Sequence, residues 1–239
     1  MRALSFAVLA LGATASTASA GQGAAQKLPS LPGAQLALAD IVRTSPSAGE
    51  GFNYRLQAAG LPRDKTYRLE IRRVGGRVGQ MPIGTLHVDG DGRLVTERGF
   101  RLEQHVLGTG PVLRGEPLEA ALVAEDGSGQ VSTRIVPAPI EARGADGCRL
   151  SVELLDPTGN AFVIKGEGFA PGEGVRLLDR SGDEVVEASK KASPGGGFEI
   201  VELPAVVGKS GGEASIAAAG RTCSVPALAY KWGTAVERG

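Results

Sequence analysis

Few residues of this chain have the types and spacing that chemistry requires, and the first candidate is a serine between glycines. Residues 208–212 read Gly-Lys-Ser-Gly-Gly, which matches the Gly-x-Ser-x-Gly nucleophile elbow of serine hydrolases. In that family the histidine base follows the serine, but His87 and His105 both precede Ser210. No helical pattern follows the serine either. The segment therefore predicts a loop between strands, and we expect no catalytic residue here.

The same Gly-Lys-Ser triplet does not predict a phosphate-binding loop. That motif requires a first glycine at the position of Leu203. Charge adds no support for a polyanionic partner, because Lys plus Arg and Asp plus Glu are balanced at 26 each. We therefore expect neither nucleotide nor nucleic acid as a ligand.

Asp89 and Asp91, followed by Gly92, resemble the opening of a calcium loop. The glutamate that should close such a loop is replaced by Phe100, so a hairpin turn is the interpretation that we prefer. Weak calcium binding, with carboxylates added from neighbouring loops, is the alternative. His87 and His105 are lone histidines, a pattern more typical of surface or half-buried residues than of ligands. We therefore expect no metal site and no cofactor.

Aromatic side chains are scarce, yet Tyr230 and Trp232 lie close together near the C-terminus. An exposed Tyr/Trp pair could anchor a sugar ring or a partner protein, so these two residues are the candidate ligand or partner surface. The alternative is that Trp232 packs over the end of the last strand.

The two cysteines, Cys148 and Cys223, lie on the flanks of the C-terminal half. An even number of cysteines in an exported chain favours a disulfide. The enclosed loop of about 75 residues corresponds to roughly 4 kcal/mol of stabilisation in the chain-entropy model. A metal or redox site is disfavoured because no Cys-x-x-Cys spacing occurs.

The N-terminus has the three regions of a secretory signal peptide in order. Arg2 precedes an apolar run over residues 3–13, and Ala18-Ser19-Ala20 is a small-x-small cleavage pattern. Residues 1–20 are therefore predicted to be a signal peptide, and residues 21–33 a flexible lead-in. No later segment is apolar enough to span a bilayer, so we expect an exported protein, periplasmic or secreted, without membrane insertion.

Composition and pattern predict an all-β chain. Gly reaches 36 and Pro 14, and short runs of Leu, Val and Ile alternate with turn residues. Residues 67–72 alternate apolar and charged side chains, which predicts a strand with one face on a core and the other in water. Residues 89–92 and 126–129 combine Asp and Gly between such runs, and both predict hairpin turns.

The chain divides near its middle, where two prolines in residues 137–139 cannot donate to a sheet. We predict a first sandwich over residues 34–138, a linker at 139–146, a second sandwich at 147–232 and a tail at 233–239. Similar segments that occur in the same order in both halves indicate that one β module was duplicated. Gly60 and Tyr67 have the same spacing as Gly168 and Val175, and residues 119–124 are echoed by residues 213–218.

Residues 166–173, Gly-Glu-Gly-Phe-Ala-Pro-Gly-Glu, resemble the bacterial immunoglobulin-like modules, including the IPT/TIG group. In these modules a strand ending in Gly-x-Gly-Phe leads through Pro-Gly-Glu into the next strand. Here Gly168 would let the chain leave the strand, and Phe169 would close the end of the sandwich. The resemblance covers mainly the second half and implies two tandem immunoglobulin-like β-sandwich domains.

Such modules serve as spacers, adhesion units, ligand-binding modules and accessory domains, so the fold does not specify the role. We predict an exported, non-catalytic binding or structural module of the bacterial cell envelope, whose partner is an envelope or extracellular protein. One alternative is a carbohydrate-binding module with a glycan ligand. The other is an accessory domain or subunit of an extracytoplasmic enzyme, with a cleft near His87, His105, Asp89 or Glu103.

Overall fold

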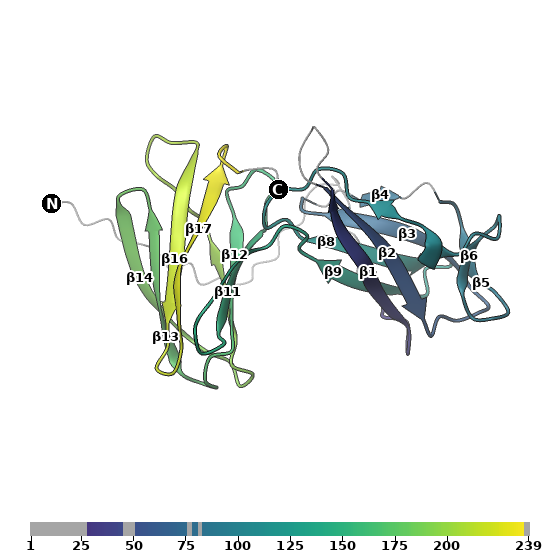
Figure 1. Ribbon diagram of the computed structural model, residues 1–239, viewed down its shortest axis with the longest axis horizontal. Helices are drawn as coiled ribbons and strands as arrows, with labels where there is room; N and C mark the ends of the chain where they lie inside the picture. The colour runs from purple at the N-terminus through teal and green to yellow at the C-terminus, as the bar shows by residue number, and fades with distance from the viewer. Residues whose placement is uncertain (1–27, 45–50, 76–77, 81–82, 237–239) are drawn as a thin grey trace, which may run out of the picture.

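The computed structural model describes residues 28–44, 51–75, 78–80 and 83–236, and almost every element in it is a β-strand (Figure 1). The predicted signal peptide and residues 21–27 of the predicted lead-in lie outside the described residues. Within those residues, a single turn of 3-10 helix, η1 (Leu102–Gln104), is the only helical element. No helix of the described chain has the length and hydropathy needed to cross a bilayer.

The first sandwich packs a sheet of strand order β1-β2-β7 against one of order β6-β5-β3-β8-β9, with β4 also paired to β3. Its core contains Tyr54, Leu56, Tyr67, Leu69 and Leu122, all buried. The strands of this sandwich are β1 (Gln35–Thr44), β2 (Gly51–Ala59), β3 (Thr66–Arg73), β4 (Val78–Gln80), β5 (Leu86–Val88), β6 (Leu94–Thr96), β7 (Leu107–Gly108), β8 (Leu118–Ala124) and β9 (Gln130–Ile135).

The alternation predicted for β3 is correct on its apolar face and incomplete on its charged face. Tyr67 and Leu69 are buried as expected. Glu70 on the other face is buried too, because Arg68 and Arg72 cover it with hydrogen bonds of 2.8 and 2.9 Å to its carboxylate. The charged face is therefore a network of ion pairs on the sheet rather than side chains separated by water.

The second sandwich packs a sheet of order β10-β11-β12-β15 against one of order β14-β13-β16-β17. A continuous core of buried side chains, among them Val152, Phe162, Ile164 and Ile216, fills the space between the sheets. The strands of this sandwich are β10 (Ile140–Arg143), β11 (Arg149–Leu154), β12 (Phe162–Glu167), β13 (Gly174–Ser181), β14 (Glu184–Lys191), β15 (Phe198–Glu202), β16 (Gly211–Ala219) and β17 (Ser224–Gly233).

The two sandwiches share a strand order, in agreement with the repeat in the sequence. One sheet of each contains an equivalent run of three strands (β1-β2-β7 and β11-β12-β15), and the other sheet contains a second equivalent run (β9-β8-β3 and β17-β16-β13). The repeated segments occupy equivalent strands, since residues 119–124 lie in β8 and residues 213–218 in β16. The fold is therefore a tandem of immunoglobulin-like β-sandwiches.

The predicted flexible lead-in is wrong for its last residues. Ser30 forms a parallel bridge with Gln130, and the Leu31 amide donates to the Gln130 carbonyl over 2.9 Å. The Leu31 side chain is 6 % exposed and packs in the first core. Leu31 docks here because its apolar side chain becomes buried. Its backbone also forms a hydrogen bond with the otherwise unpaired edge of β9.

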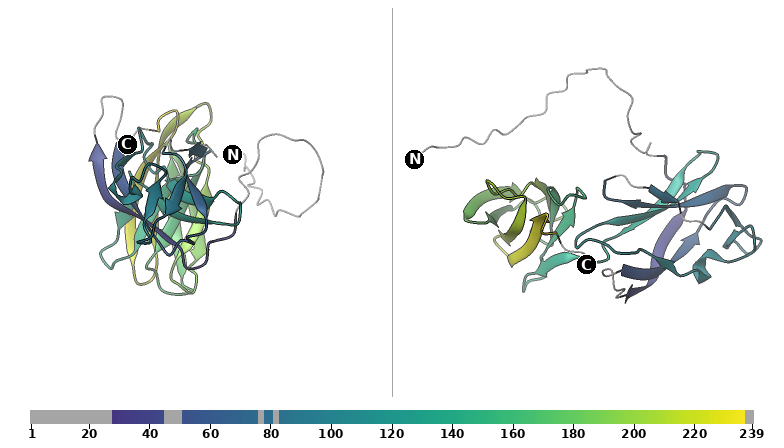
Figure 2. Two further views of the ribbon diagram at one scale, coloured as in Figure 1. Left: turned by 90° about the vertical axis from the view of Figure 1, so that its right-hand side faces the viewer. Right: turned by 90° about the horizontal axis from the view of Figure 1, so that it is seen from above.

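The linker predicted for residues 139–146 also needs correction, since Ile140–Arg143 form β10 and pair with β11. Pro139 has no amide hydrogen to donate to a sheet, which favours a linker. Ile140 is nevertheless buried in the second core, and the free energy gained by this burial favours a strand. The two sandwiches follow one another along the long axis of the molecule (Figure 2). They touch through the Leu154 amide, which donates to the Gly115 carbonyl over 2.8 Å.

Both predicted hairpin turns are present. Asp89 accepts hydrogen bonds from the amides of Asp91 and Arg93 between β5 and β6, and Asp126 accepts one from Ser128 between β8 and β9. The turn at residues 168–172 also has the predicted geometry. Gly168 has a φ of +76°, which a side chain would oppose, and Phe169 is buried against Phe198.

Candidate functional site

The structure places the glycine-flanked Ser210 in the exposed loop before β16, as the sequence predicts. Its hydroxyl lies 3.4 Å from that of Thr234, and both side chains are exposed. Both histidines belong to the first sandwich, His87 in β5 and His105 after η1. Ser210 therefore has a hydroxyl as its neighbour, and not the imidazole that would activate it.

The acidic and histidine residues of the first sandwich do not converge on one point. One oxygen of Asp89 already accepts two backbone amides, and Asp91 lies 3.5 Å from Arg93. His105 packs edge-on against Phe100, with ring centroids 6.0 Å apart. Among the described residues, no group of three or more His, Cys, Asp or Glu side chains is placed to hold a metal ion.

The candidate aromatic surface at Tyr230 and Trp232 is wrong, because both side chains point into the second core. They are 4 % and 3 % exposed, and the Tyr230 ring contacts Phe162 edge-on with centroids 5.0 Å apart. The alternation of β17 places both residues on the face that meets the opposite sheet. In a core with few aromatic residues, burying these two large rings stabilises the fold more than exposing them would.

Cys148 and Cys223 form the expected disulfide, with Cα atoms 6.1 Å apart. Cys148 precedes β11 and Cys223 precedes β17, so the bond joins the two sheets of the second sandwich at one end. Both cysteines are buried in the core. The role of this pair is structural.

Buried polar atoms without a hydrogen-bond partner reveal a site that the sequence analysis missed. In the second sandwich these atoms are Asp179 Oδ1, Ser181 Oγ, Tyr230 Oη and Trp232 Nε1. Asp179 and Ser181 lie on β13, and their cross-strand partners on β16, Ile216 and Ala214, are core residues. Buried polar groups normally have partners, so a cluster that lacks them calls for an explanation.

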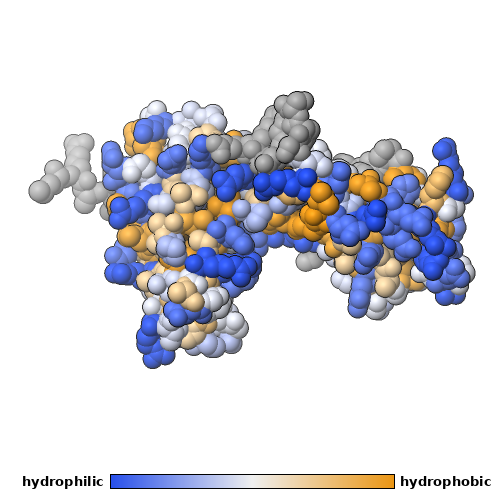
Figure 3. Space-filling model, viewed as in Figure 1, coloured by the Kyte–Doolittle hydropathy of each residue, from blue (hydrophilic) through white to orange (hydrophobic). Residues whose placement is uncertain are grey.

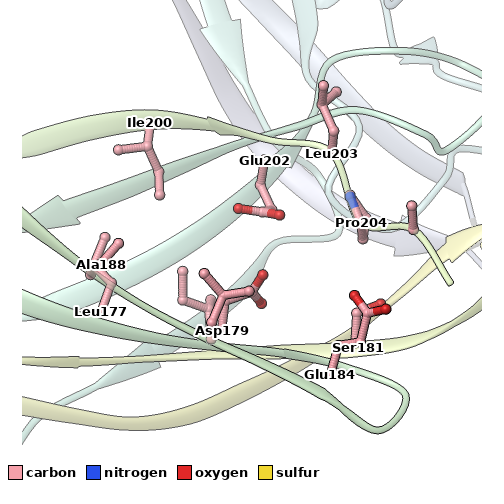
Figure 4. A pocket seen from close by; sticks show the side chains of 12 residues that line it. Leu177, Asp179, Ser181, Glu184, Ala188, Ile200, Glu202, Leu203 and Pro204 are labelled. Carbon is pink, nitrogen blue, oxygen red and sulfur yellow. The ribbon is translucent and has the colours of Figure 1, made fainter. Parts of the chain in front are cut away.

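Asp179 and Ser181 line a pocket of about 230 Å³ between the two sheets (Figure 4). Glu202, the last residue of β15, extends its carboxyl group toward that of Asp179 from the opposite side. Ser181 and Glu184 lie side by side farther along the pocket, near Pro204. The remaining lining residues are apolar: Leu177, Val186, Ala188, Ile200, Leu203, Ala205 and Ile216.

The two facing carboxyl groups have altered acidity. Burial and the neighbouring Asp179 carboxylate raise the pKa of Glu202 to about 7. Burial raises the pKa of Asp179 as well, although its hydrogen bond with Glu202 opposes the rise. Burial, followed by the charges of Asp179 and Glu202, raises the pKa of Tyr230. The pair therefore retains a proton close to neutral pH, and the Tyr230 hydroxyl stays neutral.

The pocket opens at the side of the sandwich because the two sheets are offset. β15 ends its sheet and pairs only with β12, while β14 ends the other sheet and pairs only with β13. Every residue of β14 is exposed, including Val186, which lies opposite Asp179 in the register and shares its face. The inner face of β14 and the free edge of β15 thus form a groove with the two carboxyl groups at its base.

This groove could have been recognised from the alternation of two strands. Along β13 the residues in phase with buried Val175 and Leu177 are Asp179 and Ser181. Along β15 the residue in phase with Phe198 and Ile200 is Glu202. A charged residue on the core phase is the signal, and it appears in both strands.

The fold and this groove define an all-β protein of immunoglobulin-like sandwiches, with an open groove in the second sandwich. No protein-family model and no curated protein matches the chain. One solved structure with some similarity is the tetra-tandem repeat in the extending region of a large adhesion protein, with 15% identity, a TM-score of 0.26 and 87% of this chain covered. This chain spans 50% of that chain's length.

A second solved structure is a two-domain fibronectin type-III segment from chicken tenascin. It shares 14% identity with this chain at a TM-score of 0.24, and the match covers 82% of this chain and 99% of that chain. The architecture of the present chain therefore rests on its own strand order and core, described above.

Proposed function

We propose that this chain is an exported, non-catalytic protein-interaction module of the cell envelope that binds an extended segment of a partner in the groove between β14 and β15. The observation that carries the proposal is the open edge of β15 beside the uncovered inner face of β14. Adding a strand to an exposed sheet edge is a common mode of peptide recognition, because the main chain supplies hydrogen bonds and alternate side chains enter pockets.

Natural proteins usually protect long edge strands with charge, proline or bulges. β14 carries four charged residues, but Val186, which faces the groove, is 49 % exposed. Leu203, which also lines the groove, is 65 % exposed. The space-filling view shows hydrophobic patches over both sandwiches, interrupted by hydrophilic residues (Figure 3). Exposed apolar residues at an open edge favour a partner over a purely structural role.

The inter-sheet disulfide and the signal-peptide pattern at the N-terminus support the proposed export, since structural disulfides persist in oxidising compartments. The local sequence and the turn geometry at Gly168 and Phe169 support assignment of the second sandwich to the IPT/TIG-like modules. Burial of Tyr230 and Trp232 removes the aromatic pair on which the glycan alternative depended.

The test is site-specific photocrosslinking in the cells that produce the protein. A photoreactive residue at position 188 faces the groove, and the matched control at position 187 lies on the opposite face of the same strand. We expect one stoichiometric crosslinked protein from position 188 and none from position 187. Equal labelling at both positions, or none at either, would contradict the proposal, as would recovery of the protein solely from the cytoplasmic fraction.

A further inference from the structure

We infer that the segment bound in the groove presents a lysine or arginine side chain to Asp179 and Glu202. This inference rests on the proposed function and specifies the chemistry of the partner. It is carried by the shape of the pocket, by the charge of its lining and by its unpartnered polar atoms, which are considered in turn.

The pocket has the shape for a long aliphatic side chain that ends in a polar group. Leu177 and Ile200 form apolar walls at one end, and the carboxyl groups of Asp179 and Glu202 face each other beside them. Its volume of about 230 Å³ is several times the roughly 30 Å³ of a water molecule. Lysine and arginine bury their methylene stems against apolar surface while the charged head reaches polar groups.

The lining has acidic groups without a cationic counterpart. It contains the carboxyl groups of Asp179, Glu184 and Glu202, and no Lys, Arg or His is among its residues. Two carboxyl groups in contact within a partly buried site disfavour full ionisation, so an incoming cation would replace the shared proton. An anionic ligand would be repelled by these carboxyl groups, and a neutral donor would lack the ion pair with them.

The unpartnered atoms require a hydrogen-bond donor. Asp179 Oδ1 is a buried acceptor without a partner, and the Ser181 hydroxyl, in a residue that is 7 % exposed, also lacks one. An ammonium group offers three donors and a guanidinium five, and neither can accept. One cationic head at the base of the groove can therefore satisfy Asp179 and Ser181 together while it pairs with Glu202.

Strand addition brings such a side chain to the right place. An extended segment paired with the free edge of β15 directs every second side chain toward β14. Flanking small apolar side chains would cover Val186 and Ala188, which no described strand covers. The preferred ligand is therefore an extended sequence in which small apolar residues lie two positions before and two positions after a basic residue, on the same face of the strand.

The test uses residues 21–239 of the chain and the acetylated, amidated peptide Val-Thr-Lys-Thr-Val, in which both valines share the face of the lysine. Matched peptides replace the lysine with arginine, norleucine or glutamate, and affinity is measured by calorimetry. We expect the lysine and arginine peptides to bind at least about tenfold more tightly than the norleucine peptide. We expect Asp179→Asn and Glu202→Gln each to abolish that preference, while Glu199→Gln, on the outer face of β15, retains it.

Equal binding of the lysine and norleucine peptides, or no binding of the lysine peptide, would overturn the inference. Binding of calcium chloride alone, lost in Asp179→Asn and competing with the lysine peptide, would overturn it in favour of a cation site. A crosslink at position 188 combined with equal binding of the two peptides would leave the proposed function intact and reject the basic residue alone. Circular dichroism establishes that each variant is folded.

Discussion

Asp179 and Glu202 approach each other from opposite sheets of the second sandwich, in hydrogen-bonding contact when one of them holds a proton. Asp179 is flanked across β13 by Val186 on one side and Ile216 on the other, so a carboxyl group replaces an apolar residue in the core row. Burial of such a group costs free energy unless it is neutralised or paired. The carboxyl group of Asp179 therefore lowers the free energy of unfolding, and a ligand that pairs with this group would raise that free energy.

The first prediction is that the carboxyl pair makes the second sandwich less stable as the pH rises. The groups facing the pair are Glu184 from β14, Ser181 from β13 and Tyr230 from β17. Because the folded pKa of Glu202, about 7, exceeds the unfolded value of about 4.3, the folded state holds the proton more tightly. The contribution of this proton to the free energy of unfolding is complete below about pH 4 and is lost as the pH rises through about 7.

The measurement is urea unfolding at pH 5 and pH 8, followed by the fluorescence of Trp232, the single tryptophan, which lies in the second core. After a discount for the partial exposure of Glu202, the expected loss is of the order of 1–2 kcal/mol. Glu202→Gln should remove this pH dependence and Glu199→Gln should preserve it. An identical pH dependence in wild type and Glu202→Gln would refute the assignment.

The second prediction concerns the disulfide. Replacing both Cys148 and Cys223 with alanine should lower the free energy of unfolding of the second sandwich by about 4 kcal/mol, because the bond constrains the unfolded chain. Trp232 fluorescence reports this change directly, since the tryptophan shares a core with both cysteines. An unchanged urea midpoint would mean that the bond contributes nothing to stability.

The third prediction concerns the junction of the two sandwiches. Arg134 on β9 donates to both carboxylate oxygens of Glu153 on β11, and Lys165 donates to one of them over 2.8 Å. Burial would raise the pKa of Glu153, but hydrogen bonds from Arg134 and Lys165 outweigh it and hold the pKa below its usual value. The ion pair therefore stabilises the junction above about pH 4.3 and is lost as the pH falls through the lower folded value.

Arg134→Ala should cost about 1–2 kcal/mol and widen the range of angles between the sandwiches, because it leaves the buried Glu153 with one partner fewer. Small-angle X-ray scattering would show the wider distribution. Arg143→Ala is the matched control, since its side chain is 69% exposed and lies 3.8 Å from Glu141. If the two variants gave superimposable scattering, Arg134 would not hold the junction.

The fourth prediction compares two buried tyrosines. The Tyr67 hydroxyl donates to the Pro62 carbonyl over 2.8 Å, whereas the Tyr230 hydroxyl has no partner. Tyr67→Phe should therefore cost about 1 kcal/mol, and Tyr230→Phe should be neutral or stabilising. Thermal unfolding followed by circular dichroism tests both changes. A loss at Tyr230 as large as that at Tyr67 would reveal a partner for its hydroxyl in solution.

Local chemistry made several features predictable. The hairpins at Asp89 and Asp126 depend on an Asp side chain that accepts a nearby backbone amide and on a Gly with positive φ. The alternation in β3 predicted the burial of Tyr67 and Leu69, and the same spacing in both halves indicated the shared strand order. Each of these features depends on neighbours in the chain.

The errors arose where contacts are distant in sequence. Leu31 seemed to belong to a flexible lead-in, yet it docks beside Gln130. Ile140 adjoins a proline in an expected linker, yet it is buried in the second core and its strand pairs with β11. Tyr230 and Trp232 became core residues because β17 turns them toward the opposite sheet. Free energy gained by burial against a remote strand overrode the local signal in each case.

The sequence by itself determined the all-β class, the tandem arrangement and the turns, because alternation, glycine and the repeat act over a few residues. It also contained the signal of the groove, as charged residues on the core phase of β13 and β15. The offset of the two sheets decided that Asp179 and Glu202 face each other. It also left β14 uncovered beside them. This offset follows from how side chains far apart in the chain pack together, which no local pattern records.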